Sequence, residues 1–125
     1  MLRRYEVVGI VLAATAFAMV GLALRPVPIV AETDCEIVAG EVERVYEGGT
    51  HDVYLRLAGD SRLYYINRGL ERGLVLADLQ RTLPGRRATV KFPRYWTPLD
   101  PVSQSRHVAR LELDGVVLFD ETEQS

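Results

Sequence analysis

The side chains best suited to binding a ligand are concentrated between residues 62 and 107, which are rich in Arg and aromatic residues. A guanidinium group can donate two parallel hydrogen bonds to a carboxylate or a phosphate, and a flat ring stacks on a sugar or another planar ligand. Both groups occur in the consecutive residues Arg94, Tyr95 and Trp96. The candidate ligand-binding residues are Tyr64, Arg68, Arg94, Tyr95, Trp96 and His107.

Some of these candidates also have a purely structural interpretation. Arg68 lies in a turn sequence and can pair with Glu71 instead of a ligand. The Tyr95–Trp96 pair can fold back over the domain as part of its core instead of stacking on a ligand. We expect Trp96 to be such a lid, and we expect Arg94, directly after Pro93, to reach solvent.

The residue types that perform catalysis or hold metals do not form a complete motif. Ser103, Ser105 and His107 are close in sequence, but no nucleophile-elbow motif surrounds them. A metal site needs several converging ligands, and besides carboxylates the chain offers only His51, His107 and Cys35. The sequence therefore predicts no catalytic residue, no metal and no cofactor. Cys35 is either a thiol without a role or the site of a disulfide between adjacent chains.

An uncharged segment of 18 residues, Val7 to Leu24, precedes these residues. As a helix it would extend about 27 Å, close to the thickness of the hydrocarbon core of a bilayer. A cleaved signal peptide is the alternative, but the sequence before Glu32 is a poor cleavage site because Ile29 stands where a small residue is preferred. We expect residues 1–25 to be an uncleaved anchor.

The charges around this segment predict its orientation. Arg3 and Arg4 precede it, whereas a single basic residue, Arg25, directly follows it. The positive-inside rule places the amino end in the cytoplasm and the rest of the chain outside it. We therefore expect a single-pass protein of the cell (inner) membrane with an extracytoplasmic domain.

The charge of that domain bears on its partners. Residues 32–125 hold 12 of the chain's 15 basic residues and 16 of its 17 acidic residues, so their net charge is −4. A domain that binds a polyphosphate backbone usually carries a basic excess. No nucleic-acid partner is predicted.

Hydrophobic periodicity predicts a mainly β domain over residues 36–119, after a tether over residues 26–35. A long first strand bends between Val42 and Val45, a hairpin follows, and a short helix with apolar positions at Leu76, Leu79 and Leu83 precedes the later strands. Asp114-Gly115 predicts a final tight hairpin. We expect residues 120–125 to be a disordered tail.

Three strands, a helix, then two or more strands is the order of the oligonucleotide/oligosaccharide-binding (OB) fold. We therefore predict a small OB-like Greek-key barrel of five to six strands with one short helix, behind the membrane helix. In that fold, ligands bind on strands two and three between two loops, which are residues 47–52 and 93–105 here. The second of these loops carries Arg94, Tyr95 and Trp96.

A resemblance to other proteins is carried by three stretches of this chain, YYINRGLERGL, PRYWTPLDP and RHVARLELDG. In residues 40–119 it resembles a group of small, uncharacterised bacterial proteins, mostly with one amino-terminal membrane segment. The resemblance implies an OB-like domain and adds no chemistry. The turn Glu47-Gly48-Gly49-Thr50 also resembles, more weakly, a turn of secreted nucleases of this barrel class, but the metal-binding carboxylates are incomplete.

These observations predict a non-catalytic, membrane-anchored module outside the cytoplasm that binds another protein of the cell envelope or takes part in assembly. One alternative is binding of a small solute or glycan at the loop of residues 93–105. The other is a nuclease-like enzyme.

Overall fold

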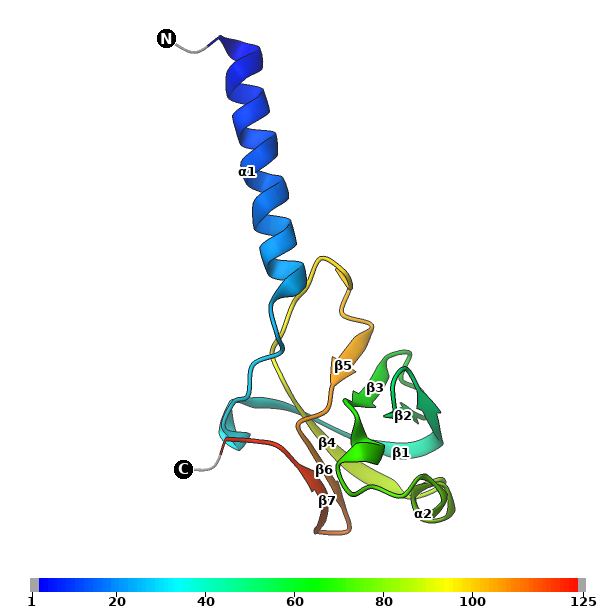
Figure 1. Ribbon diagram of the computed structural model, residues 1–125. Helices are drawn as coiled ribbons and strands as arrows, with labels where there is room; N and C mark the ends of the chain where they lie inside the picture. Colours follow the sequence, from blue (N-terminus) through cyan, green and yellow to red (C-terminus); the bar gives the residue numbers. More distant parts are fainter. Residues whose placement is uncertain (1–2, 124–125) are drawn as a thin grey trace.

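The structure is a computed structural model that describes residues 3–123. An apolar helix at the amino end stands apart from a domain built mainly of β-strands (Figure 1). The domain holds one short α-helix, as the sequence predicts, so the mainly β class with an amino-terminal apolar helix is confirmed. The predicted count of five to six strands is wrong, because the described residues form a mixed sheet of seven strands.

Helix α1, Arg4–Leu24, is the predicted membrane segment. Its 21 residues extend about 32 Å at the usual helical rise, and none of its side chains is buried. It is long and apolar enough to span a membrane. The helix ends at Arg25-Pro26, since proline cannot continue it.

Strand β1, Cys35–Gly48, is long and serves two neighbours. Its first half pairs antiparallel with β4, Arg87–Pro93, and its second half pairs antiparallel with β2, Asp52–Leu57. The register shifts between Val42 and Arg44, which confirms the predicted bulge. The bend carries β1 from one part of the sheet to the other.

Strand β3, Leu63–Ile66, completes the predicted hairpin with β2. A 3₁₀ turn, η2 (Gly69–Glu71), and helix α2, Leu76–Thr82, then lead to β4. The last hairpin joins β6, Arg110–Leu113, to β7, Val116–Asp120. Its turn residues Asp114 and Gly115 have φ angles of 51° and 78°, as a tight hairpin turn requires.

The sequence from Arg106 through Leu113 alternates in the way that is typical of one strand, but the structure divides it into two. β5, Ser105–His107, pairs parallel with β3, whereas β6 pairs antiparallel with β4. Between them the Val108 N–H donates to the Tyr65 carbonyl and the Ala109 N–H to the Lys91 carbonyl, each at 2.8 Å. The chain therefore changes neighbour within two residues, which produces two short strands. The sheet order is β5-β3-β2-β1-β4-β6-β7.

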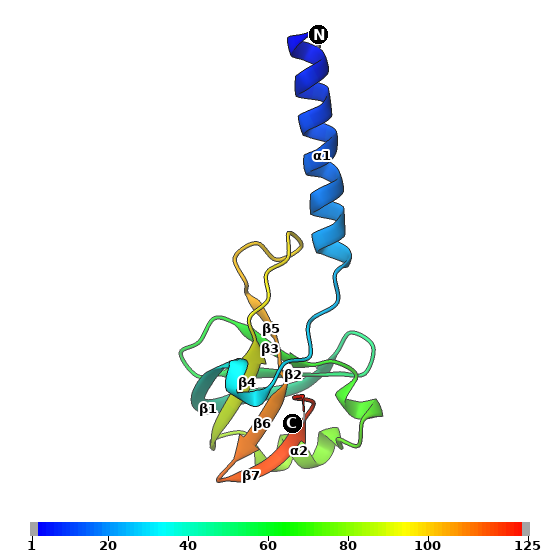
Figure 2. The ribbon, with the colours of Figure 1, turned by 90° about the vertical axis from the view of Figure 1, so that its left-hand side faces the viewer.

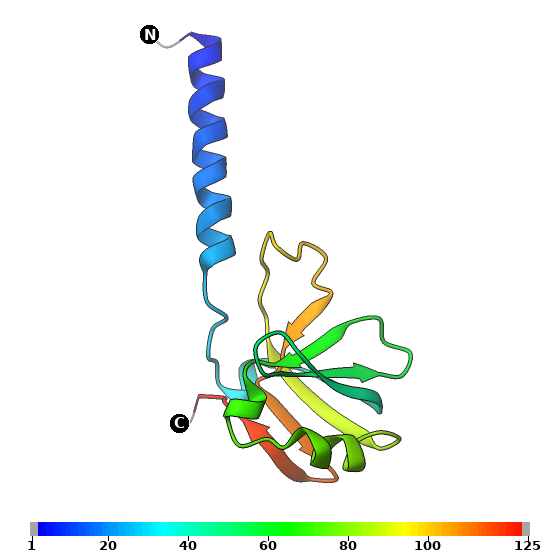
Figure 3. The ribbon, with the colours of Figure 1, turned by 45° about the vertical axis from the view of Figure 1, so that its right-hand side comes forward.

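The core lies on the inner face of these strands. It is formed by Val and Leu residues at alternate strand positions, by aromatic rings, by Leu79 of α2 and by Leu83 directly after that helix. Figure 3 shows α2 at the end of the domain opposite α1. The buried strand residues include Val42, Val45, Val53, Leu55, Leu57, Tyr64, Ile66, Val90, Phe92 and Leu111.

Two segments expected to be loose make defined contacts. In the tether, a 3₁₀ turn η1, Glu32–Asp34, places Glu32 against Lys91 of β4. In the tail, Thr122 is buried, and the Glu123 N–H donates to the Val30 carbonyl at 2.8 Å. The tail prediction thus needs correction for residues 120–123, because side chains and backbone there pair with the domain and the tether. Residues 124–125 of the expected tail lie outside the described residues.

Candidate binding face and loop pocket

Four aromatic side chains lie side by side on the outer face of the sheet. Tyr46 of β1 is the register partner of Tyr54 of β2, Tyr54 is the partner of Tyr65 of β3, and Tyr65 is the partner of His107 of β5. Directly paired residues place their side chains on the same face. We call these four residues the aromatic row. All four are half-buried.

Two pairs of rings in the aromatic row meet edge to face. Tyr46 and Tyr54 have ring centroids 5.3 Å apart at 87°, and Tyr65 and His107 have centroids 5.4 Å apart at 89°. The guanidinium carbon of Arg44 lies 4.3 Å from the Tyr46 ring centroid, close enough for a cation–π interaction. Gly48 makes room for this arrangement, because a Cβ atom there would collide with the Tyr54 ring.

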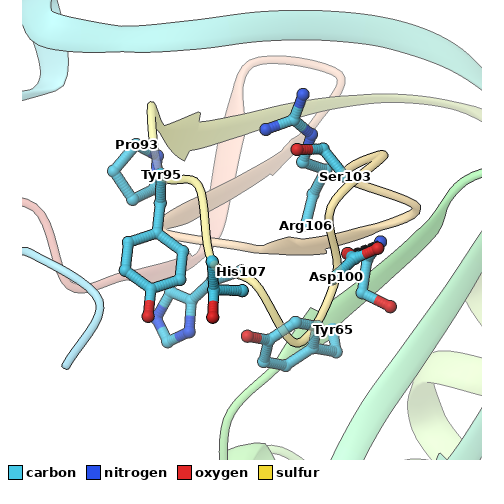
Figure 4. A pocket seen from close by; sticks show the side chains of 9 residues that line it. Tyr65, Pro93, Tyr95, Asp100, Ser103, Arg106 and His107 are labelled. Carbon is cyan, nitrogen blue, oxygen red and sulfur yellow. Dashed lines mark hydrogen bonds between the residues drawn. The ribbon is translucent and has the colours of Figure 1, made fainter. Parts of the chain in front are cut away.

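A small pocket continues the row beneath the loop between β4 and β5. Its volume is about 80 Å³, and Figure 4 shows the His107 ring between those of Tyr95 and Tyr65. Asp100 shapes the loop, since its carboxylate accepts the backbone N–H groups of Gln104 at 3.0 Å and Ser105 at 2.8 Å. The pocket is lined by Tyr65, Pro93, Tyr95, Thr97, Asp100, Ser103, Ser105, Arg106 and His107.

A carboxylate fixes His107 at the end of the row. Nε2 of His107 contacts Oε1 of Glu121, while Oε2 of the same carboxylate accepts a hydrogen bond from Arg72 at 2.6 Å. Burial raises the pKa of Glu121, but the hydrogen bonds from His107 and Arg72 outweigh burial, and the pKa is lowered overall. Glu121 therefore holds a negative charge behind the His107 ring.

The pocket is small for a ligand site. A water molecule occupies about 30 Å³ in the liquid, whereas pockets for drug-sized ligands measure about 300–1,000 Å³. Among residues 3–123, no three His, Cys, Asp or Glu side chains are placed to hold a metal ion together.

Searches against protein-family models, curated proteins and solved structures found no match to this chain.

The predicted site residues separate into three locations. Tyr95 and His107 come together in the pocket, and Trp96 lies on the same loop. Tyr64 is fully buried on the inner face, where its hydroxyl donates to Asp60 at 2.5 Å. Burial and this hydrogen bond raise the pKa of the Tyr64 hydroxyl well above its ordinary value. Tyr64 therefore faces the core and away from the aromatic row.

The two predicted arginines lie outside the pocket. Arg68 has a positive φ of 52°, and its Nε lies 3.8 Å from Glu71, which agrees with the structural interpretation of that turn. Arg94 reaches solvent as expected, because its side chain is 83% exposed beside Glu36. Neither guanidinium lines the pocket.

The expected lid role of Trp96 needs correction. Its side chain is 41% exposed, and its indole N–H donates within its own loop to the Pro101 carbonyl at 3.0 Å. The ring therefore packs on its own loop and does not cover the core.

Sequence reasoning missed most of the aromatic row. Tyr46, Tyr54 and Tyr65 are ordinary strand residues in the sequence, and only the cross-strand register aligns them. The alternation of β2, with Val53 and Leu55 inward, already indicates that Tyr54 faces outward. Glu121 was assigned to the tail, and no local pattern signals its pairing with His107.

Proposed function

We propose that this chain is a non-catalytic, membrane-anchored protein-binding module of the cell envelope, whose extracytoplasmic domain is an OB-like barrel. The aromatic row carries the proposal, because it places four partly exposed rings side by side on the outer face of the sheet, where a partner can contact them. Aromatic and Arg side chains are enriched at the centres of protein interfaces. Both occur here, since the Arg44 guanidinium lies over Tyr46 at one end of the row.

Strand connectivity supports the OB-like assignment. β1 is shared by β2 and β4, and β5 and β6 follow each other with only Val108 and Ala109 between them. Counted as one bent strand, they link β3 to β4, and the order β1-β2-β3-β5/β6-β4 returns to β1. This connectivity supports the proposal of an OB-like arrangement of the strands.

Ring geometry favours a protein over a sugar or a small solute. Tyr46 and Tyr54 meet at 87°, so they do not form one flat platform on which a sugar ring can stack. The adjoining pocket of about 80 Å³ is too small for most ligands. An irregular, open surface of rings and guanidinium groups suits the side chains of a protein partner.

The anchor supports a partner in the envelope. α1 is long and apolar enough to span a membrane, and Arg3 and Arg4 lie at its amino end. With the amino end in the cytoplasm, the domain lies outside the inner membrane. A membrane-impermeant maleimide tests this orientation at Thr50→Cys in a Cys35→Ser background: labelling of intact cells is expected, and labelling only after lysis would reverse it.

Affinity purification tests the binding role. The tagged full-length chain is recovered from detergent-solubilised membranes as the wild type, as Tyr46→Ser/Tyr54→Ser, and as the control Val116→Ser/Val117→Ser on the exposed side of β7. We expect the wild type and the control to retain the same partner protein and the row variant to lose it. Wild-type protein that repeatedly returns alone would refute the proposal and favour the small-solute or glycan alternative at the loop.

A further inference from the structure

The β4–β5 loop, residues 94–104, exposes an unusual amount of apolar surface. Leu99 is 78% exposed and Val102 is 71% exposed. Trp96, on the same loop, is 41% exposed. Three large apolar side chains on one loop of eleven residues are costly to leave in water. They indicate that another apolar phase covers the loop.

The loop is fixed beside the carboxyl end of α1. The Tyr95 hydroxyl donates to the Arg25 carbonyl at 2.6 Å, and a guanidinium nitrogen of Arg25 donates to the Trp96 carbonyl at 2.8 Å. The same guanidinium lies over the Tyr95 ring at 4.8 Å. Figures 1 and 2 both show the loop rising from the domain toward the end of the helix.

The backbone of this loop satisfies much of its own hydrogen bonding. The Asp100 N–H donates to the Thr97 carbonyl at 3.1 Å, and the Ser103 N–H donates to the Asp100 carbonyl at 3.0 Å. The Asp100 carboxylate accepts the N–H groups of Gln104 and Ser105, and the indole N–H of Trp96 is bonded to Pro101. A segment whose polar groups are paired internally can enter an apolar phase at lower cost.

We infer that the β4–β5 loop rests in the interfacial region of the bilayer, with Trp96, Leu99 and Val102 in contact with lipid. This rests on the proposed anchoring by α1, since Arg25 places the loop at the level where that helix leaves the membrane. Trp, Tyr and Arg are the side chains that favour the membrane–water interface, and Tyr95 and Arg25 meet here. The loop is then a second membrane contact, which fixes the tilt of the domain.

The fluorescence of Trp96 reports on this contact directly, because Trp96 is the only tryptophan of the chain. The full-length protein is reconstituted into phosphatidylcholine vesicles, with and without lipids brominated near the headgroup end of their acyl chains. We expect brominated lipid to quench Trp96, and aqueous iodide to quench it weakly. Lipids brominated near the chain methyl end are expected to quench less, because the loop lies at the interface.

Two variants serve as test and control. Leu99→Ser/Val102→Ser removes apolar side chains from the loop, and we expect it to lose most of the lipid quenching and to gain iodide quenching. Val116→Ser changes an equally exposed apolar residue on β7, at the opposite end of the domain, and it is expected to match the wild type.

The outcomes separate the loop contact from the anchor. Protein that floats with the vesicles but shows iodide quenching and no bromolipid quenching would overturn the loop contact and leave the anchor and the proposed function intact. That outcome would leave the loop available to a protein. A chain that fails to float with vesicles would overturn the anchor and the loop contact together.

Discussion

Strands β2 and β3 present two faces of opposite character. Val53, Leu55, Tyr64 and Ile66 point inward and are fully buried, whereas Tyr54 and its neighbours in the aromatic row point outward and are half-buried. The inner face packs as a core does, through apolar contact with little room for change. The outer face holds rings that the core does not use. Within one hairpin, alternate residues therefore form the core and the proposed binding face.

The largest effect is expected from a charge on the inner face. Val53→Asp places an unpaired carboxylate beside Ile66 and Gly69, where no solvent reaches. We expect a loss of about 4 kcal/mol or more in the free energy of unfolding, measured by thermal denaturation followed by circular dichroism. Val116→Asp, the same change at a side chain 61% exposed, should cost little. Equal melting temperatures for the two variants would remove the distinction between the faces.

A smaller effect is expected where the outer row is held in place. Glu121→Gln weakens the contacts to His107 and Arg72, so we expect a loss of about 2 kcal/mol near neutral pH. Folding lowers the pKa of Glu121 below its ordinary value of 4.5. Its contribution is therefore present above pH 4.5 and is lost as the pH falls through the lower folded-state pKa.

Urea denaturation at a series of pH values measures this dependence. Between neutral pH and the acid range, the stability of Glu121→Gln should fall less than that of the wild type. Glu43→Gln, at an exposed position of β1, is the matched control. Parallel stability curves for the wild type and Glu121→Gln would show that the carboxylate does not stabilise the end of the row.

The adjacent residues Tyr64 and Tyr65 allow a closer test of the two faces. Tyr64→Phe removes the hydroxyl that donates to Asp60 at 2.5 Å, and we expect a loss of about 1 kcal/mol. Tyr65→Phe changes a ring on the outer face and is expected to cost less than about 0.5 kcal/mol. Chemical denaturation of both variants gives the order, and a larger loss for Tyr65→Phe would reverse the assignment.

The smallest effects are expected on the β4–β5 loop. Trp96→Ala should cost less than about 1 kcal/mol, because the ring packs on its own loop and leaves the core intact. Arg94→Ala should cost less still, since its side chain is 83% exposed. Thermal melts of both variants test this order. A loss of about 3 kcal/mol or more for Trp96→Ala would restore the lid interpretation.

The sequence carried local information well. Alternation in Asp52–Leu57, helical spacing in Leu76–Thr82 and the Asp114-Gly115 turn each depend on near neighbours, and each prediction is confirmed. The apolar amino-terminal helix was equally clear, because 18 uncharged residues in succession need no tertiary context.

Features that depend on contacts between distant residues could not be predicted from the sequence. The division of one expected strand into β5 and β6 depends on β3 and β4 competing for the same segment. The pairing of Glu121 with His107 joins residues 14 apart, and Trp96 looked like a core residue because aromatic rings usually are buried. Which of Tyr64 and Tyr65 faces outward required the register of the hairpin, which no single residue specifies.

The contacts of the tether limit how far the domain can reach. Glu32 is held by Lys91, and Arg110 lies 3.5 Å from the same carboxylate. Val30 is held as well, because its carbonyl accepts the Glu123 N–H. Only residues 25–29 then separate the fixed part of the tether from Leu24 at the end of α1, and five extended residues span at most about 18 Å. With α1 as the proposed anchor, the aromatic row would stay in a thin layer above the bilayer, in which a proposed partner diffusing in the same membrane has a high effective concentration. The short tether would then favour partners that are themselves membrane-bound, since a soluble partner gains no such advantage.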